Sequence, residues 1–243
     1  MSSDELTQPA PADLDPLTVL AGGEVEVLGR MPWSSNATFL VTLHHDGAEA
    51  RAIYKPGSGE RPLWDFPEGL YRREAAAYVL SEAMGVGVVP PTIVRDDAPL
   101  GPGSLQWFVE ADFSQHYFPL YEERPDLHDQ FRRIAVFDLI ANNTDRKSGH
   151  CLIDATERVW AIDNGLCFSE DFKLRTVIWE FGGEDLSEEL IAHVRAAIDG
   201  VTSLESLLRP DELAAVIDRA EALLASGRFP IDATGRRYPW PLV

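Results

Sequence analysis

The order of strand-like and helix-like segments constrains the fold of this chain more than any other feature of its sequence. Short alternating or apolar segments predict strands, at residues 24–28, 37–44, 50–54, 88–94, 104–110, 151–154 and 159–162. Helical spacing of apolar residues predicts helices, at 71–84, 127–142, from Ser187 to before Gly200 and from Pro210 to before Gly227. Asp46–Gly47 is a strong hairpin-turn signal. Residues 111–124 fit neither pattern, so we expect irregular structure there.

This order is neither the strand–helix alternation of a parallel sheet nor an all-β array. It predicts an α+β fold in which a small antiparallel sheet with one helix precedes a mainly helical half. We expect the acidic segment 1–16, which is rich in proline and alanine, to be a disordered leader. The rest is expected to form one domain, residues 17–243, with an N-lobe over about 17–110 and a C-lobe over about 111–243. The aromatic tail at 238–241 is expected to dock on the body of the protein.

Charge and composition exclude several classes of partner. The 243 residues include 21 Lys and Arg against 40 Asp and Glu, for a net charge of −19. Such an acidic chain is poorly suited to non-specific binding of nucleic acid or anionic lipid, so we expect neither nucleic-acid binding nor stable membrane association. No apolar run approaches the roughly 20 residues of a membrane span. The first residues lack the basic start and apolar segment of a secretory signal, and the two cysteines make no disulfide framework, so we expect a cytoplasmic protein.

Four features of the sequence together favour phosphoryl transfer. They are a small-residue loop, Ser34–Ser35–Asn36; Lys55, one of only three lysines, at the end of the third strand; Glu74 on the next helix; and two loop carboxylates, Asp145 and Asp163. Phosphates need backbone N–H donors and a lysine, and the lysine needs a carboxylate partner. The attacking hydroxyl needs an aspartate, and the metal ion needs another.

The spacing within the two loops is more specific than any single residue. Asp145-x-Lys147-x-x-His150 has the spacing of the kinase catalytic loop Asp-x-Lys-x-x-Asn, with histidine in the last place. Asp163-Asn164-Gly165 has the form of the Asp-Phe-Gly metal motif, with asparagine in place of phenylalanine. The separation between them leaves room for one β-hairpin, as in kinases.

These loops resemble those of a known family. Asn143-x-Asp145-Arg146-x-x-Gly149-His150 with Ile162-Asp163-x-Gly165 is similar to the catalytic and metal loops of phosphatidylinositol 3- and 4-kinases. Atypical kinases of the HipA and Fam20 types also look similar, and the chain resembles most an uncharacterised bacterial family related to the lipid kinases. The resemblance covers roughly residues 24–200 and implies a two-lobed protein-kinase-like fold.

The resemblance also implies roles for individual residues. Asp145 matches the catalytic aspartate and Lys147 a charge-neutralising lysine, whereas Asp163 and His150 match the metal ligands. The nucleotide-binding residues implied in the same way are Lys55, its helix partner Glu74, the phosphate loop Ser34, Ser35 and Asn36, and the linker Phe108, Val109 and Glu110, whose backbone meets adenine. The implied cofactors are ATP and a divalent metal, Mn²⁺ or Mg²⁺.

The expected function is therefore that of a kinase that moves the γ-phosphate of ATP to a hydroxyl. Only Lys173 and Arg175 mark the stretch with which lipid kinases hold inositol phosphates, so a protein or small molecule is the expected acceptor. Two alternatives remain open. A nucleotide-binding pseudokinase fits the departures at His150 and Asn164, and a metal-dependent hydrolase could use Asp145, His150 and Asp163 but has no need of Lys55.

Overall fold

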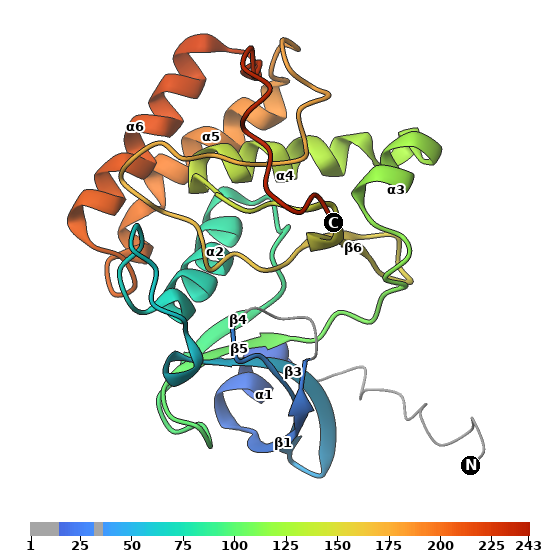
Figure 1. Ribbon diagram of the computed structural model, residues 1–243, viewed down its shortest axis with the longest axis vertical. Coiled ribbons are helices and arrows are strands. Elements are labelled where there is room, and N and C mark those ends of the chain that lie inside the picture. Colours follow the sequence, from blue (N-terminus) through green and yellow to red (C-terminus); the bar gives the residue numbers. More distant parts are fainter. Residues whose placement is uncertain (1–14, 32–35) are drawn as a thin grey trace. The chain divides into compact units, whose positions relative to one another are not determined.

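The computed structural model describes residues 15–31 and 36–243, and the chain divides into two compact units. Of the described residues, the first contains 15–31, 36–61 and Pro91–Phe108, and the second contains Pro62–Pro90 and Val109–Val243 (Figure 1). The expected division near residue 110 placed the first long helix in the N-lobe, whereas this helix groups with the second unit. Each unit has its own apolar core.

The first unit is built on one antiparallel five-stranded sheet in the order β1-β2-β3-β5-β4. Its strands are β1 (Glu24–Arg30), β2 (Phe39–His45), β3 (Ala48–Pro56), β4 (Thr92–Arg95) and β5 (Gly103–Trp107). Asp46 and Gly47 both have positive φ angles, so the predicted hairpin turn between β2 and β3 is confirmed. All five strands expected in this half of the chain are present, with ends that differ by a few residues.

One face of this sheet is covered by a helix that we did not expect. Helix α1 (Pro16–Gly22) packs against β2, β4 and β5, and its Val19 and Leu20 share one core with alternate buried residues of β2 and β3. Proline stands in its first turn, and the Asp15 side chain accepts a hydrogen bond from the Thr18 backbone N–H as the N-cap. The helix thus begins at the last residue of the segment expected to be a leader, and its seven residues are too few to show clear periodicity. Residues 1–14 lie outside the described part of the chain.

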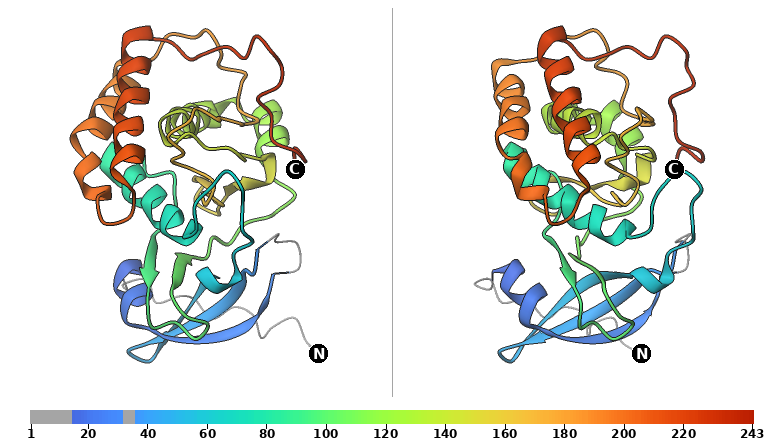
Figure 2. Two further views of the ribbon diagram at one scale, coloured as in Figure 1. Left: turned by 60° about the vertical axis from the view of Figure 1, so that its left-hand side comes forward. Right: turned by 90° about the vertical axis from the view of Figure 1, so that its left-hand side faces the viewer.

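The second unit is mainly helical. Its helices are α2 (Leu70–Met84), α3 (Tyr117–Glu123), α4 (His128–Ala141), α5 (Glu188–Asp199) and α6 (Pro210–Ser226), and its two short strands are β6 (Cys151–Ile153) and β7 (Val159–Ala161). Short 3₁₀ turns occupy Pro125–Leu127, Ser148–His150 and Val201–Leu204, and another, Gly57–Gly59, lies in the first unit. Helices α5 and α6 pack side by side (Figure 2), and Ser187 caps α5 as predicted.

The expectation of irregular structure at 111–124 is wrong over α3. Helix α3 has seven residues. Pro119 lies within its first turn, where the lack of a backbone N–H on proline is tolerated. Its stability comes from packing, because Tyr117 and Leu120 are buried in the core of the unit. No helix in the described residues is both long enough and apolar enough to span a membrane.

Candidate active site

The predicted catalytic loop leaves the C-terminus of α4 and runs to β6. Asn142 ends α4 in the left-handed conformation, with φ of 54°, which asparagine tolerates better than most residues. Asn143 then shapes the next turn, because its side-chain oxygen accepts the backbone N–H of Asp145 at 2.9 Å. Its amide nitrogen donates to Asp138 of α4 at 3.1 Å. The backbone at Asp145 is therefore oriented by a side chain that is itself held by the helix.

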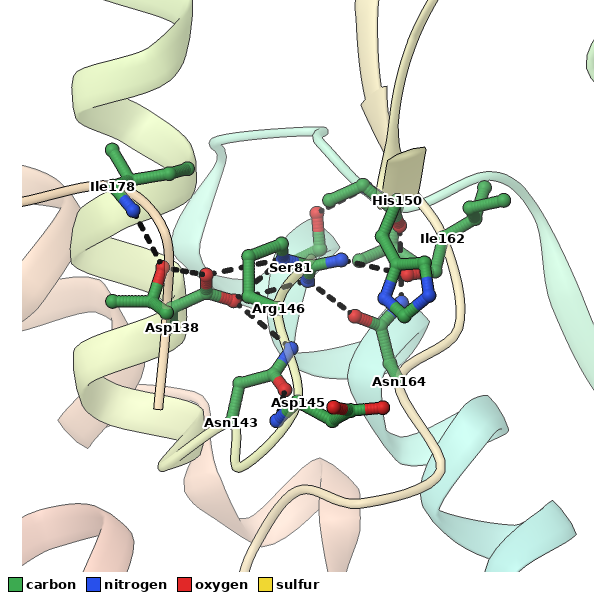
Figure 3. A network of polar contacts seen from close by, with 12 residues as sticks. Ser81, Asp138, Asn143, Asp145, Arg146, His150, Ile162, Asn164 and Ile178 are labelled. Carbon is green, nitrogen blue, oxygen red and sulfur yellow. Dashed lines mark hydrogen bonds and ion pairs between the residues drawn. The ribbon is translucent and has the colours of Figure 1, made fainter. Parts of the chain in front are cut away.

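A fully buried ion pair lies behind Asp145. The guanidinium of Arg146 donates through Nε and an Nη atom to the carboxylate of Asp138, at 3.0–3.2 Å (Figure 3). Burial raises the pKa of Asp138, although Arg146 opposes this, and the carboxylate raises the pKa of Arg146 despite its burial. A buried charge is tolerated only when it is paired, so this pair fixes the loop to α4.

The same guanidinium reaches the predicted metal loop. Arg146 donates to the Ile162 carbonyl and to the side-chain oxygen of Asn164, both at 2.6 Å. Asn164 also donates its side-chain amide to Ala161 O at 3.0 Å. The asparagine that replaces phenylalanine is therefore a buried polar partner of Arg146, and it joins the two loops.

Glu74 of α2 contacts the metal loop from another side. Its carboxylate accepts the backbone N–H of Asn164 at 3.0 Å, and both residues are buried. A Cβ atom on Gly165 would lie 3.1 Å from the Glu74 carboxylate, so glycine permits this close approach. Glu82, the other glutamate of α2, is exposed. Of the two, Glu74 is the one that contacts the candidate site.

Asp145 and Lys147 form an ion pair on the open side of the loop. The Lys147 Nζ atom lies 3.1 Å from the Asp145 carboxylate. Burial raises the pKa of Asp145, Lys147 works against this rise, and the nearby charge of Asp163 adds to it. A carboxylate with a raised pKa is a stronger base than an ordinary one, which suits a group that accepts a hydroxyl proton.

His150 and Asp163 face each other across the two loops. The Nε2 atom of His150 lies 3.5 Å from a carboxylate oxygen of Asp163. Nδ1 accepts the Lys147 backbone N–H at 3.4 Å, so the neutral ring carries its proton on Nε2 in this arrangement. Ligation of a metal ion by Nε2 requires the other tautomer, in which Nδ1 carries the proton and no longer accepts the Lys147 N–H. Asp163 has a φ of 57°, a strained backbone of the kind found at functional sites.

These side chains fit a divalent cation that is shared with phosphate oxygens. The mutual repulsion of Asp145 and Asp163 marks a place where a cation is favoured. In the described residues, no group of three His, Cys, Asp or Glu side chains is arranged to hold a metal ion by itself. Magnesium at nucleotide sites commonly takes one or two protein carboxylates and completes its shell with phosphates and water. The donor set therefore suits a cation that arrives with a nucleotide.

The remaining candidate residues belong mostly to the first unit. Lys55 lies on β3 opposite Ser104 of β5, and its neighbours Tyr54 and Pro56 are buried. Close pairing at this position requires Gly103, because a Cβ there would lie 2.5 Å from the Lys55 carbonyl oxygen. Asn36 accepts the Arg61 backbone N–H at 3.1 Å. Ser34 and Ser35 lie outside the described residues.

The linker predicted to meet adenine spans the division between the units. Phe108 is the last residue of the first unit and Val109 the first of the second, and none of the residues from Phe108 to Glu110 is in a helix or strand. Phe108 donates its backbone N–H to Arg51 O of β3 at 3.1 Å.

Of the candidate residues, the structure brings together Glu74, Asp145, Lys147, His150 and Asp163, all in the second unit.

The sequence interpretation identified the charged residues of the two loops but not what holds them. The carboxylate of Asp138 on α4 pairs with the Arg146 side chain, a contact that we did not predict. The available signal was an aspartate among the apolar residues of the helix predicted over 127–142. Cys151 and Cys167 are buried, and burial raises the pKa of Cys151 to about 12 and that of Cys167 well above its usual range, which agrees with inert thiols.

Comparison with known proteins identifies the family of this chain. Residues 65–190, just over half of the chain, match the family of phosphatidylinositol 3- and 4-kinases. Protein Rv2133c of Mycobacterium tuberculosis is 36% identical over 265 residues, which cover 93% of this chain and 95% of that protein.

Two solved structures share the fold. They are the Helicobacter pylori proinflammatory kinase CtkA, with a TM-score of 0.50 and 9% identity, and hydra Fam20 with sugar, with a TM-score of 0.54 and 12% identity. Each alignment covers 86% of this chain, with 94% of CtkA and 86% of Fam20. The fold is therefore that of an atypical kinase, and the chain belongs to the phosphatidylinositol 3- and 4-kinase family.

Proposed function

We propose that this protein is an ATP-dependent phosphotransferase that moves the γ-phosphate to a hydroxyl group. The main support is the ion pair of Asp145 and Lys147 beside Asp163, with a pKa of Asp145 that burial raises. Asp145 orients the hydroxyl and accepts its proton, and Lys147 neutralises charge on the transferred group. A cation, when bound, supplies further charge neutralisation at the phosphates.

The other residues bind and orient. Asp163 and His150 hold the cation, and Glu74 positions the loop that carries Asp163 through the Asn164 backbone N–H. Lys55 anchors the phosphates that are not transferred. The Phe108–Glu110 backbone meets the adenine.

Replacing Lys55 with methionine tests the nucleotide assignment. Binding of ATP should weaken by about 1.5–3 kcal/mol, the range for a hydrogen bond to a charged group. Turnover should fall further, because the lysine also aligns the phosphates. Isothermal titration and phosphate release measure the two effects. Arg51→Met is the matched control. It also removes one positive charge, and the alternation of side chains places Arg51 on the same face of β3 as Lys55. Wild-type turnover in a folded Lys55→Met protein would sink the assignment.

The metal preference tests His150. Imidazole is a softer ligand than the usual asparagine oxygen and favours later divalent ions over magnesium. We expect higher activity with Mn²⁺ than with Mg²⁺, a narrower gap in His150→Asn, and loss with both ions in His150→Ala. Assays across both metals at fixed ATP measure this. Full activity of His150→Ala without a manganese preference in the wild type would make His150 a structural residue.

The acceptor is proposed to be a protein or a small molecule. Lys173, in the loop after the metal motif, is paired with Asp65, whose carboxylate is 3.8 Å away. Arg175, the other basic residue of that loop, is exposed, and the protein as a whole carries a net charge of −19. We expect no salt-sensitive binding to vesicles that contain phosphoinositide, measured by co-sedimentation against neutral vesicles. Tight binding that salt abolishes would contradict this.

The alternative is a nucleotide-binding pseudokinase. The observation that favours it is the His150 ring, whose Nδ1 accepts from Lys147 and whose Nε2 therefore carries the proton that faces Asp163. A pseudokinase would bind ATP with Lys55 in place but would not turn it over with any divalent metal. Binding and turnover measured on the same preparation separate the two functions.

A further inference from the structure

The segment after α6 returns to the catalytic loop. It leaves the helix at Gly227 and ends beside β6 (Figure 1). We call residues 232–243 the C-terminal strap. The strap forms backbone hydrogen bonds with the rest of the second unit at two separated places. The Leu242 carbonyl accepts the backbone N–H of Ser148 at 2.8 Å, directly after Lys147. The Arg237 carbonyl accepts the Thr176 backbone N–H and the Trp179 indole N–H, both at 3.1 Å.

The loop contacted by Arg237 is the one that follows the metal motif. Its Thr176 forms a parallel bridge with Arg146 of the catalytic loop. The Arg146 N–H donates to Arg175 O at 3.0 Å, and the Val177 N–H donates to Arg146 O at 3.0 Å. The hydrogen bonds therefore form a closed ring of three segments: the catalytic loop bonds to 175–177, Thr176 to the strap, and the strap to Ser148.

The donors that the strap satisfies are buried. Ser148 and Thr176 are 0% and 3% exposed, so their N–H groups have no ready replacement in water. The strap is held in turn by Arg237, whose N–H donates to Asp232 at 2.9 Å and whose guanidinium lies 4.7 Å from the centre of the Phe172 ring. Leu242 packs against the core of the unit.

Ser148 has further contacts that the strap completes. Its hydroxyl bonds to His116 Nδ1 at 2.6 Å and accepts the Phe118 N–H at 3.0 Å. Three elements thus fix the residue next to Lys147: the start of α3, the 3₁₀ turn and the strap. Because Ser148 directly follows Lys147 in the chain, its position limits where the Asp145–Lys147 pair can lie.

We propose that the C-terminal strap is a positioning element of the active site. It holds the catalytic loop and the loop at 172–179 in the relative positions that phosphoryl transfer requires. This inference rests on the proposed function for its catalytic consequence. Its structural part, the ordering of the two loops, stands independently. Leu242 and Arg237 are the positioning residues, and they act through Ser148 and Thr176.

Hydrogen exchange measured by mass spectrometry tests the ordering. Deleting residues 236–243 should speed exchange about tenfold or more in peptides over 144–151 and 174–180, whereas α5 and α6 keep wild-type protection. Leu242→Ala, which removes packing of the strap and leaves the rest of the chain, should act in the same direction at 144–151. Val243→Ala is the matched control, because that side chain is 60% exposed. If the protein that lacks residues 236–243 does not fold, the exchange of Leu242→Ala over 144–151 tests the proposal by itself.

Turnover tests the consequence. In Leu242→Ala, kcat for ATP turnover should fall about tenfold at unchanged KM for ATP, because misplaced catalytic groups slow the chemical step without weakening binding. Exchange at 144–151 equal to that of Val243→Ala overturns the proposal, and so does a rise in kcat, which would make the strap inhibitory. A wild type without turnover but with the expected exchange pattern overturns the proposed function instead.

Discussion

Replacing Arg146 with methionine should lower the free energy of unfolding by about 3–5 kcal/mol, the cost of leaving one partner of a buried ion pair alone. The carboxylate of Asp138 would remain fully buried, with Asn143 and Thr176 as its remaining hydrogen-bond donors among the described residues. The loop that carries Asp163 would also lose the bonds from Arg146 to Ile162 and Asn164. Guanidinium unfolding at pH 7 measures the loss.

Two further measurements separate the ion pair from general packing. Burial raises the pKa of Asp138, and removing Arg146 removes a group that opposes this rise. The folded variant should therefore bind a proton more readily than the unfolded chain, so the deficit should shrink as the pH falls from 7 toward 5. Asp138→Leu with Arg146→Met should cost less than Arg146→Met alone, because no charge is left unpaired. A deficit under about 1 kcal/mol, or one independent of pH, would contradict this account.

Replacing Asp145 with asparagine should cut turnover about 10²–10⁴-fold, the usual contribution of a general base. It should not reduce stability. The folded-state pKa of Asp145 is raised, so the ionised carboxylate costs the folded state free energy at neutral pH. That cost disappears as the pH falls through the raised pKa and below the ordinary value of 3.8. We therefore expect unfolding of Asp145→Asn at pH 7 at the same or a higher denaturant concentration, with phosphate release almost abolished.

The pH profile supplies the control for this prediction. Activity should fall on the acid side as Asp145 takes up a proton, at a pH above that of an ordinary carboxyl group. Lys147 lowers this pKa, so Lys147→Met should move the acid limb to higher pH, whereas Lys147→Arg should leave it near the wild-type position. An acid limb that does not move in Lys147→Met would show that another group controls it.

The strands and the longer helices were predictable because their signals are local. Alternation and turn residues mark the sheet of the first unit, and Gly85 and Ser187 mark helix ends at the places where they occur. Helices α1 and α3 were missed because each has seven residues, so tertiary packing decides them and periodicity does not.

The site could be predicted only as far as short-range spacing reaches. Asp145, Lys147 and His150 lie within six consecutive residues, so one motif contains them. The contact of Glu74 with Asn164 joins residues 90 apart, and that of Arg73 with Glu212 joins residues 139 apart. No local sequence pattern encodes contacts between residues so far apart in the chain. Asn164 departs from the Asp-Phe-Gly motif, and only the structure shows that its side chain binds Arg146.

Helix α2, which carries Glu74, is fastened along its length. Arg73 forms a buried ion pair with Glu212 of α6 and donates to Cys167 O at 3.1 Å, and His193 of α5 donates to Met84 O at 2.7 Å. Many kinases are switched on and off by displacement of the helix that carries this glutamate, which requires a second resting place for it. A displacement of α2 would separate the Arg73 guanidinium from the buried Glu212 carboxylate, which would then rely on Arg209, whose backbone N–H donates to it at 2.8 Å. Moving α2 outward would therefore cost free energy, so a compound that requires a displaced α2 is expected to bind this protein weakly.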